Sequence, residues 1–243
     1  MLKLENITFS ADNNGKTAEI INDISLEIPE NKFIVITGPN GGGKSTLAKL
    51  IAGIEKPTSG KLYFEGKDIT AASITERANM GIGFAFQQPV RFKGLTVLDL
   101  LRIAEGKNLS ISEACEYLSE VGLCAKDYIH REVNSSLSGG ELKRIEIATV
   151  LARKVRLAVF DEPEAGIDLW SFNNLIRIFE NMRKGELQRT VIVISHQERI
   201  LNIADEIIVI TDGKVTKQGS KDEILPEIIG SNYAMNACPR IEE

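Results

Sequence analysis

The strongest constraint in this chain is the segment at residues 38–45, GPNGGGKS, which matches the phosphate-loop pattern G-x-x-x-x-G-K-[ST]. An apolar run precedes it at residues 33–37, and Leu47, Leu50 and Ile51 follow at helical spacing. This order predicts a buried strand, a glycine-rich turn and the start of a helix. Glycines let backbone N–H groups turn inward around phosphate oxygens, and the helix N-terminus adds a positive dipole. The segment therefore predicts a nucleoside triphosphate site.

The residue types in this loop suit the two charged parts of a nucleotide complex. Lys44 can reach the β and γ phosphates, and the Ser45 hydroxyl can bind Mg²⁺. The residues expected to surround the nucleotide are Gly38, Pro39, Asn40, Gly41, Gly42, Gly43, Lys44, Ser45 and Thr46. The loop alone does not indicate which process the triphosphate drives.

Two carboxylates, Asp161 and Glu162, follow an apolar run at residues 157–160. A carboxylate at the end of a buried strand can hold Mg²⁺ through water, and we expect Asp161 to do so. Glu162, which should point to the opposite side, is the candidate general base that activates the attacking water. A solvated strand end is the alternative for an acidic pair, but the phosphate loop upstream favours the catalytic interpretation.

Gln87 and His196 follow two further strand patterns, which end at Phe86 and Ser195. The Gln87 amide can contact both Mg²⁺ and the attacking water, and an ordinary loop glutamine is the alternative. His196 can donate a hydrogen bond from a neutral imidazole to the γ-phosphate, and a structural or solvated histidine is the alternative. The other histidine, His130, is expected to be an ordinary surface residue.

A second glycine-rich helix start lies at residues 137–141, LSGGE, ahead of a long helical pattern that runs to Ala152. Ser138, Gly139 and Gly140 are therefore candidates for a further phosphate contact. A helix N-cap is the structural alternative for Ser138, and the two roles are compatible. Two such helix starts cannot easily close on one nucleotide within one subunit.

The order of these motifs resembles that of the ABC ATPases over nearly the whole chain. Gln87, Asp168 and His196 fall where that family has a sensing glutamine, an aspartate after the acidic pair and a histidine after a later strand. The resemblance implies ATP hydrolysis and adds Asp168 to the nucleotide-binding residues. It also implies a head-to-tail homodimer in which the signature of one subunit caps the ATP of the other. Ala11 stands where the family has an adenine-stacking aromatic residue, so looser base recognition is expected.

Local strings bear on the role of such an ATPase. The strings that resemble the ATPase of the SUF iron–sulfur cluster assembly system are FAFQQPV at 84–90, KRIEI at 143–147, EAGID at 164–168 and SHQERIL at 195–201. Pro163, in contrast, is the form that transporter subunits have. The resemblance implies SUF-type scaffold proteins as partners, which ATP-driven dimerisation would rearrange. The membrane subunits of a transporter are the alternative partners.

The pattern of apolar runs predicts an α/β fold, namely a P-loop NTPase core with a mostly parallel sheet, an N-terminal antiparallel β subdomain and a helical insert, as in an ABC nucleotide-binding domain. Residues 2–9 and 20–28 alternate apolar and polar positions and predict a hairpin with a turn at residues 11–15. Helices are expected at residues 97–104 and 111–121, the second capped by Ser110.

These elements predict a single domain in three parts. Residues 1–86 and about 137–230 form the core, residues 87–136 form the helical subdomain, and residues 231–243 form a tail. A short helix is expected after Lys221.

Composition excludes several classes of function. A net charge of −5 gives no general electrostatic attraction to nucleic acid, so none is expected as a partner. Apolar runs are far shorter than the roughly 20 residues that span a bilayer, and no signal peptide is visible, so a cytoplasmic protein without direct membrane insertion is expected. Cys115, Cys124 and Cys238 lack metal-binding spacing and are expected to be free thiols, with Cys238 the only exposed one.

Overall fold

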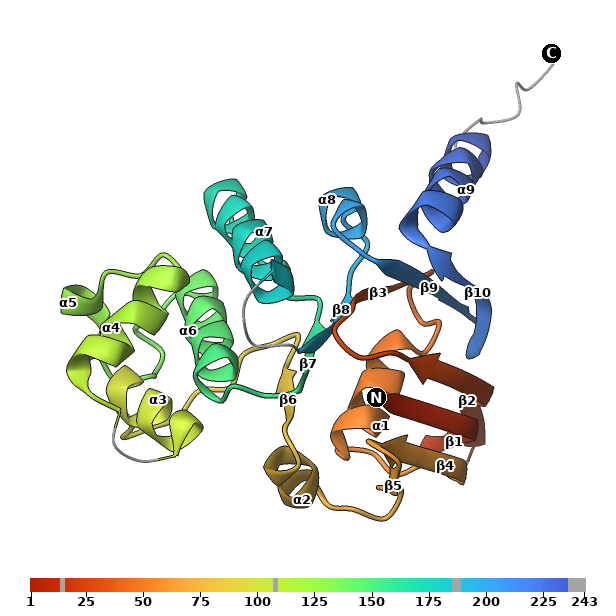
Figure 1. Ribbon diagram of the computed structural model, residues 1–243, viewed down its shortest axis with the longest axis horizontal. Coiled ribbons are helices and arrows are strands. Elements are labelled where there is room, and N and C mark those ends of the chain that lie inside the picture. The colour runs from red at the N-terminus through yellow and green to blue at the C-terminus, as the bar shows by residue number, and fades with distance from the viewer. Residues whose placement is uncertain (14–15, 107–108, 185–188, 236–243) are drawn as a thin grey trace.

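A six-stranded sheet forms the centre of the computed structural model, which describes residues 1–13, 16–106, 109–184 and 189–235 (Figure 1). In sheet order its strands are β10 (Lys214–Ser220), β9 (Glu206–Thr211), β3 (Phe33–Thr37), β8 (Thr190–Ile194), β7 (Leu157–Asp161) and β6 (Ile82–Ala85). Neighbouring strands from β9 to β6 are parallel, and only β10 pairs in the antiparallel direction. The predicted α/β fold with a mostly parallel sheet is confirmed.

The middle strands are apolar because both of their faces are covered. All residues of β3, β7 and β8 are buried. Phe33 and Val35 of β3 belong to the hydrophobic core on one side of the sheet, and Ile34 and Ile36 belong to the core on the other side. A strand buried on both faces needs side chains that pack in both directions, which explains the uninterrupted apolar runs.

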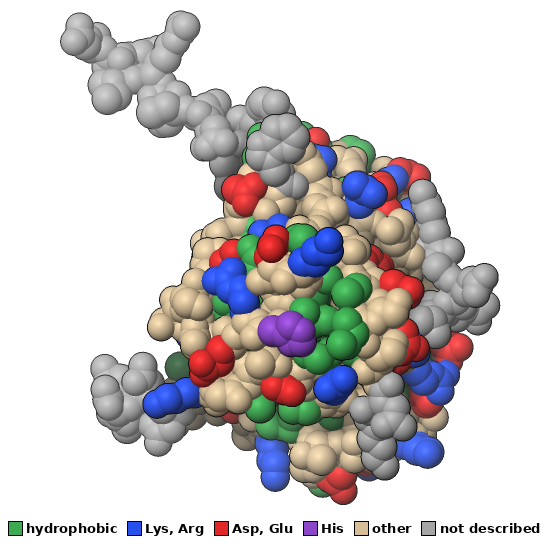
Figure 2. Space-filling view, turned by 90° about the vertical axis from the view of Figure 1, so that its left-hand side faces the viewer, with side chains coloured by type: hydrophobic (Ala, Val, Ile, Leu, Met, Phe, Trp, Pro, Cys, Tyr) green, Lys and Arg blue, Asp and Glu red, His purple; other side chains and the backbone are tan. Residues whose placement is uncertain are grey.

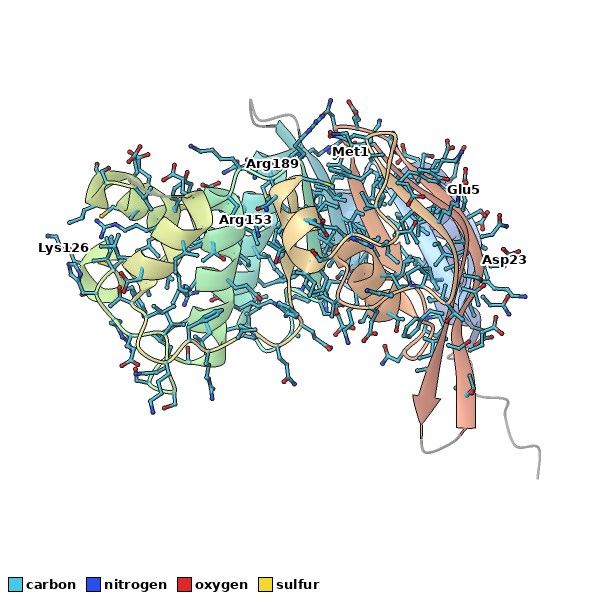
Figure 3. All side chains as sticks on the ribbon, turned by 90° about the horizontal axis from the view of Figure 1, so that it is seen from below. Met1, Glu5, Asp23, Lys126, Arg153 and Arg189 are labelled. Atoms are coloured by element: carbon cyan, nitrogen blue, oxygen red, sulfur yellow. The ribbon has the colours of Figure 1, made fainter. Side chains whose placement is uncertain are left out.

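A second sheet, entirely antiparallel, is built from the N-terminal part of the chain. Its order is β2-β1-β4-β5, with β1 at Leu2–Asn13, β2 at Lys16–Ile28, β4 at Ser59–Phe64 and β5 at Lys67–Asp68. The predicted hairpin exists, but its strands are longer than expected: Ala11 pairs with Ala18 and Asn13 pairs with Lys16. The polar residues taken for a turn continue the ladder, because backbone pairing does not need apolar side chains. In Figure 3 this end of the hairpin extends beyond the body of the molecule.

The helices occupy the connections between strands. Their bounds are α1 (Lys44–Ala52), α2 (Ile74–Asn79), α3 (Val97–Glu105), α4 (Ile111–Glu120), α5 (Ala125–Tyr128), α6 (Gly139–Ala152), α7 (Leu169–Lys184), α8 (Glu198–Asn202) and α9 (Lys221–Met235). The helices predicted at 97–104 and 111–121 are confirmed to within one residue. Ser110 caps α4 as expected, and Glu113 completes its capping box. The helix predicted after Lys221 is present, and it continues into the segment expected to be a tail.

The segment at residues 87–136 contributes no strand of either sheet in its described part; it forms α3, α4 and α5 and one isolated bridge between Thr96 and Glu132. Helix α6 packs against α3 and α4, so these four helices lie together on one side of the parallel sheet (Figure 1). The face that they present in Figure 2 carries acidic and basic side chains intermixed with a hydrophobic group around one histidine. The division of the domain at residues 86 and 137 stays a prediction.

A buried arginine fixes the helix that follows the phosphate loop. Arg77 is completely buried, and its Nη1 donates to the carbonyl oxygens of Leu50 and Ile51 at 2.5 and 3.0 Å. Burial lowers the pKa of Arg77. A cation at the C-terminal end of α1 satisfies carbonyls that have no partner within the helix and interacts favourably with its dipole.

In the described residues, no helix combines the length and the apolar composition that crossing a bilayer requires. Cys115 is half-buried and Cys124 is exposed, and both are free thiols, as predicted. The expectation that Cys238 alone is exposed is wrong, because Cys124 lies in the turn before α5 rather than in a buried element. Cys238 lies outside the described residues.

Candidate functional site

The phosphate loop is shaped by glycines that no other residue could replace. Gly38 has a φ of 131°, and a Cβ built there would lie 2.0 Å from the Ile210 carbonyl oxygen of β9. Gly43 has a φ of 98°, and its Cβ would lie 2.7 Å from Cδ1 of Ile21 in β2. Glycine alone combines this backbone conformation with such close approach. The loop is therefore wedged between the two sheets, with the N-terminus of α1 directly behind it.

Within the loop, the tip is open and the base is closed. Pro39, Asn40 and Gly41 are exposed, whereas Gly42 and Gly43 are buried and Thr46 is half-buried. The Gly42 N–H closes the turn by donating to the Pro39 carbonyl oxygen at 3.2 Å.

Lys44 keeps its ammonium group at the mouth of the loop. Its Nζ donates to the carbonyl oxygens of Gly38 and Pro39, at 2.8 Å each, and the residue is 5% exposed. Burial lowers the pKa of Lys44, and the negative charges of Glu162 and Asp161 oppose that shift. A partly desolvated cation next to loop carbonyls is prepared to bind an anion more strongly than it binds dipoles.

Ser45 and Asp161 supply adjacent oxygen atoms. The Ser45 hydroxyl donates to Oδ1 of Asp161 at 2.9 Å, although the two residues are far apart in the chain. Asp161 is 3% exposed; burial raises its pKa, and the hydrogen bond from Ser45 opposes the shift. Hydroxyl and carboxylate oxygens are the donors that Mg²⁺ prefers, so this pair fits the ion.

Gln87 and Glu162, which follow the ends of the paired strands β6 and β7, meet across the site. Gln87 Nε2 donates to Oε2 of Glu162 at 2.6 Å. Glu162 has a φ of 44°, which is uncommon for a residue with a side chain, and its N–H donates to the Ile194 carbonyl oxygen at 3.1 Å. The turn after β7 is thereby pinned to β8, and the half-buried carboxylate is held by an amide.

His196 lies exposed where β8 ends. Partial desolvation of the ring lowers its pKa, the positive charge of Lys44 acts in the same direction, and Glu162 acts against both. The lowered pKa favours the neutral imidazole at neutral pH, in which one nitrogen donates and the other accepts. The interaction with Lys44 and Glu162 places His196 within the same group of charges.

Ser138 is the N-cap of the second glycine-rich helix start, the structural role given above as an alternative to phosphate binding. It caps α6: its side chain accepts from the Glu141 N–H at 3.3 Å, and Glu141 Oε2 accepts from the Ser138 N–H at 2.6 Å. Tyr128 donates a hydrogen bond to Oε1 of Glu141, and Arg131 pairs with it at 3.7 Å. These contacts fix the start of α6 from the side of α5.

The start of α6 does not lie at the phosphate loop of its own chain. In Figure 1, α6 stands among the helices at one side, whereas α1 lies beyond the sheet. A Cβ at Gly139 would meet no atom within 4 Å, and at Gly140 only Ile167 Cγ2, at 3.9 Å. Packing within this chain therefore does not require glycine at either position.

Asp168 also has a local structural partner. Its carboxylate accepts from the backbone N–H of Ser171 at 3.0 Å and from the Ser171 hydroxyl at 2.6 Å, at the start of α7. The structure thus brings together the phosphate loop, Gln87, Asp161, Glu162 and His196, and it leaves Asp168 at the start of α7 and the glycines at the start of α6. His130 is exposed, as predicted.

Three groups near the site were not singled out from the sequence. Lys143 is 1% exposed and forms an ion pair with Glu146 at 3.3 Å. Glu164 accepts a hydrogen bond from the Ser195 hydroxyl, and burial raises the pKa of its carboxyl. Lys143 could have been found from the sequence, because it is a charged residue within the apolar face of the helix pattern between Leu142 and Ile147.

Comparison with known proteins gives consistent matches. A family model described as ABC transporter matches residues 21–165. An uncharacterized ABC transporter ATP-binding protein of Methanocaldococcus jannaschii is 39% identical, over 92% of this chain and 90% of that protein. The lipopolysaccharide export system ATP-binding protein LptB of Acidithiobacillus ferridurans is 34% identical, over 86% and 87%. A dimeric, post-hydrolysis structure of the ATP-binding cassette MJ0796 with ADP and phosphate superimposes with a TM-score of 0.82 at 26% identity, over 91% of this chain and 99% of that chain.

Proposed function

Since the chain belongs to the ABC transporter family and is an ATPase, we propose that it is the ATP-hydrolysing subunit of a transporter, acting as an ATP-dependent head-to-tail dimer on membrane subunits. The observation that carries the catalytic part is the hydrogen bond between Gln87 and Glu162 beside the Ser45–Asp161 pair. It supports the proposal because an amide and a carboxylate then lie close to the Ser45 and Asp161 oxygens that we assign to Mg²⁺.

The residues then divide the work of phosphoryl transfer. Lys44 offsets the charge of the β and γ phosphates, and Ser45 and Asp161 would hold Mg²⁺, which would supply positive charge to the phosphate oxygens. Glu162 accepts a proton from the attacking water. The water oxygen bonds to the γ-phosphorus, and the bond from that phosphorus to the β,γ-bridging oxygen breaks. The products are ADP and inorganic phosphate. Gln87 orients the water, and neutral His196 donates to a γ-phosphate oxygen.

The proposal of a dimer rests on the position of α6. Ser138, Gly139 and Gly140 stand at a glycine-rich helix N-terminus whose glycines this chain does not need for its own packing. A phosphate group of the ATP bound by a second subunit could approach them closely. In that arrangement Asp168 would also reach the partner's nucleotide. The solved structure of MJ0796 is dimeric, which supports the same assembly for this chain.

Ser138→Arg tests the dimer. The variant should bind ATP as the wild type does, because Ser138 is far from its own phosphate loop, but it should not dimerise with ATP. The measurement is molar mass by light scattering in a Glu162→Gln background, where ATP is not consumed. Ser110→Arg, at the equivalent cap of α4, is the matched control and should still dimerise. An ATP-dependent dimer of Ser138→Arg would contradict the assembly.

The choice of partner is supported by the relatives. The protein from Acidithiobacillus ferridurans is named for lipopolysaccharide export, and the one from Methanocaldococcus jannaschii for ABC transport. The second candidate is a SUF-type ATPase that rearranges scaffold proteins in iron–sulfur cluster assembly. The four strings at residues 84–90, 143–147, 164–168 and 195–201 favour it, but neither relative carries a SUF name.

Affinity capture from native cells tests the partner. Tagged Glu162→Gln protein with ATP should be recovered from detergent-solubilised membranes with a polytopic membrane protein. Recovery of SUF-type scaffold proteins from the soluble fraction, with no membrane protein, would replace the transporter by the second candidate. The ATPase chemistry would be unaffected by either result.

A further inference from the structure

A buried lysine on α6 holds the backbone next to Gln87. Lys143 is 1% exposed, and its Nζ donates to the carbonyl oxygen of Phe86 and, at 3.4 Å, to that of Gln87. Burying an ammonium group is costly unless it is paired and hydrogen-bonded. The lysine therefore has a fixed set of partners, and two of them lie at the end of β6.

Glu146, on the same face of α6 one turn later, binds the other polar backbone group of Phe86. Its Oε1 accepts from the Phe86 N–H at 2.9 Å, and its Oε2 lies 3.3 Å from Lys143 Nζ. Strand β6 ends at Ala85, so the backbone N–H and C=O of Phe86 lie beyond the hydrogen bonds that pair β6 with its neighbouring strand. Two side chains of a helix thus replace the hydrogen bonds of a neighbouring strand.

The anchored backbone lies one residue from the amide that meets Glu162. Gln87 follows Phe86 directly, and its side chain donates to Glu162 at 2.6 Å. At the other end, α6 begins at the Ser138 cap, five residues before Lys143, which is roughly 7.5 Å along a helix. One rigid element therefore joins the glycine-rich helix start to the position of Gln87.

We propose that Lys143 and Glu146 are positioning residues that set Gln87 against Glu162 and couple the placement of α6 to ATP hydrolysis. This inference rests on the catalytic roles proposed for Gln87 and Glu162. When a partner's nucleotide binds at the start of α6 and shifts the helix, the pair moves the Phe86 backbone with it. The Gln87 amide then moves relative to the carboxylate.

A purely structural ion pair would behave differently. Replacing a buried pair by apolar side chains is often neutral or even stabilising for a fold. The discriminating quantity is thus turnover in a folded variant, together with its dependence on Gln87. Small displacements of a catalytic group can change kcat with little effect on substrate binding.

The test compares Lys143→Met, Glu146→Gln and the paired Lys143→Met/Glu146→Leu variant, each with and without Gln87→Ala. We expect kcat to fall roughly tenfold in each, with the KM for ATP within about twofold. In the Gln87→Ala background the same changes should cause no further loss, because the residue through which they act is gone. The paired variant leaves no buried charge unpaired, so it should melt near the wild-type temperature while still losing activity.

Arg153→Met is the matched control, since it removes a cation from the C-cap of α6 that donates to the Ala78 carbonyl oxygen and not to the Gln87 segment. It should turn over ATP at the wild-type rate. Two results would overturn this inference but not the role proposed for Gln87. One is a wild-type kcat in the folded paired variant. The other is a further loss of kcat when the Lys143 or Glu146 substitutions are added to Gln87→Ala. Wild-type kcat in Gln87→Ala itself would overturn both the inference and the role proposed for Gln87.

Discussion

Replacing Glu162 by glutamine is expected to lower kcat by about 10²–10⁴-fold while ATP still binds. The amide keeps the shape of the side chain and can still contact Gln87, which in the wild-type protein donates to a Glu162 carboxylate oxygen at 2.6 Å. It cannot accept the proton that the attacking water must lose. Because the phosphate loop, Ser45 and Asp161 are unchanged, bound ATP should accumulate, and the dimer should persist. Single-turnover hydrolysis and equilibrium binding of ATP measure the two quantities separately.

Glu198→Gln is the control for this substitution. Glu198 is exposed at the start of α8, two residues after His196, and its side chain takes no part in the hydrogen bonds described for the site. Its variant should hydrolyse ATP at the wild-type rate. A Glu162→Gln protein with near wild-type turnover would show that another group accepts the proton, and would remove Glu162 from the mechanism.

Lys44→Ala should weaken ATP binding by roughly 10–100-fold, corresponding to the loss of one or two charge-assisted hydrogen bonds, and turnover should fall with it. The substitution removes the cation at the mouth of the phosphate loop and also both hydrogen bonds from Nζ to Gly38 and Pro39. Affinity can be measured by calorimetry with Mg²⁺ and a non-hydrolysable ATP analogue.

Lys49→Ala removes the same charge from the same helix, at its last turn, and should bind the analogue normally. Thermal melting of both variants without nucleotide separates loss of the site from loss of the fold. Unchanged affinity in a folded Lys44→Ala protein would mean that the loop backbone, and not the ammonium, supplies the phosphate contacts.

The elements that could be predicted from the sequence are those whose neighbours impose a pattern. Strands β3, β7 and β8 are buried on both faces and are correspondingly apolar. The start of α4 is predictable because Ser110 and Glu113 have the spacing of a capping box. Strand β10 could not be recognised, because its residues are largely exposed and only backbone pairing with β9 defines it. The length of the β1–β2 hairpin was underestimated for the same reason.

The site divides in a similar way. Its strand-end residues were predictable, since the carboxyl ends of parallel strands meet at one edge of a sheet. The bond between Gln87 and Glu162 spans 75 residues, and the pairing of Lys143 with the Phe86 backbone spans 57. Which atoms meet over such distances depends on packing between elements, and a single sequence does not encode it in any local pattern.

The two-sided burial of β3 has a mechanical consequence for the site. Loop residues 38–43 follow a strand that packs against a hydrophobic core on each face, so the backbone of the loop is held from both sides of the sheet. Helix α6, in contrast, contributes its buried side chains to one core only. We therefore expect α6, rather than the phosphate loop, to shift when a nucleotide binds.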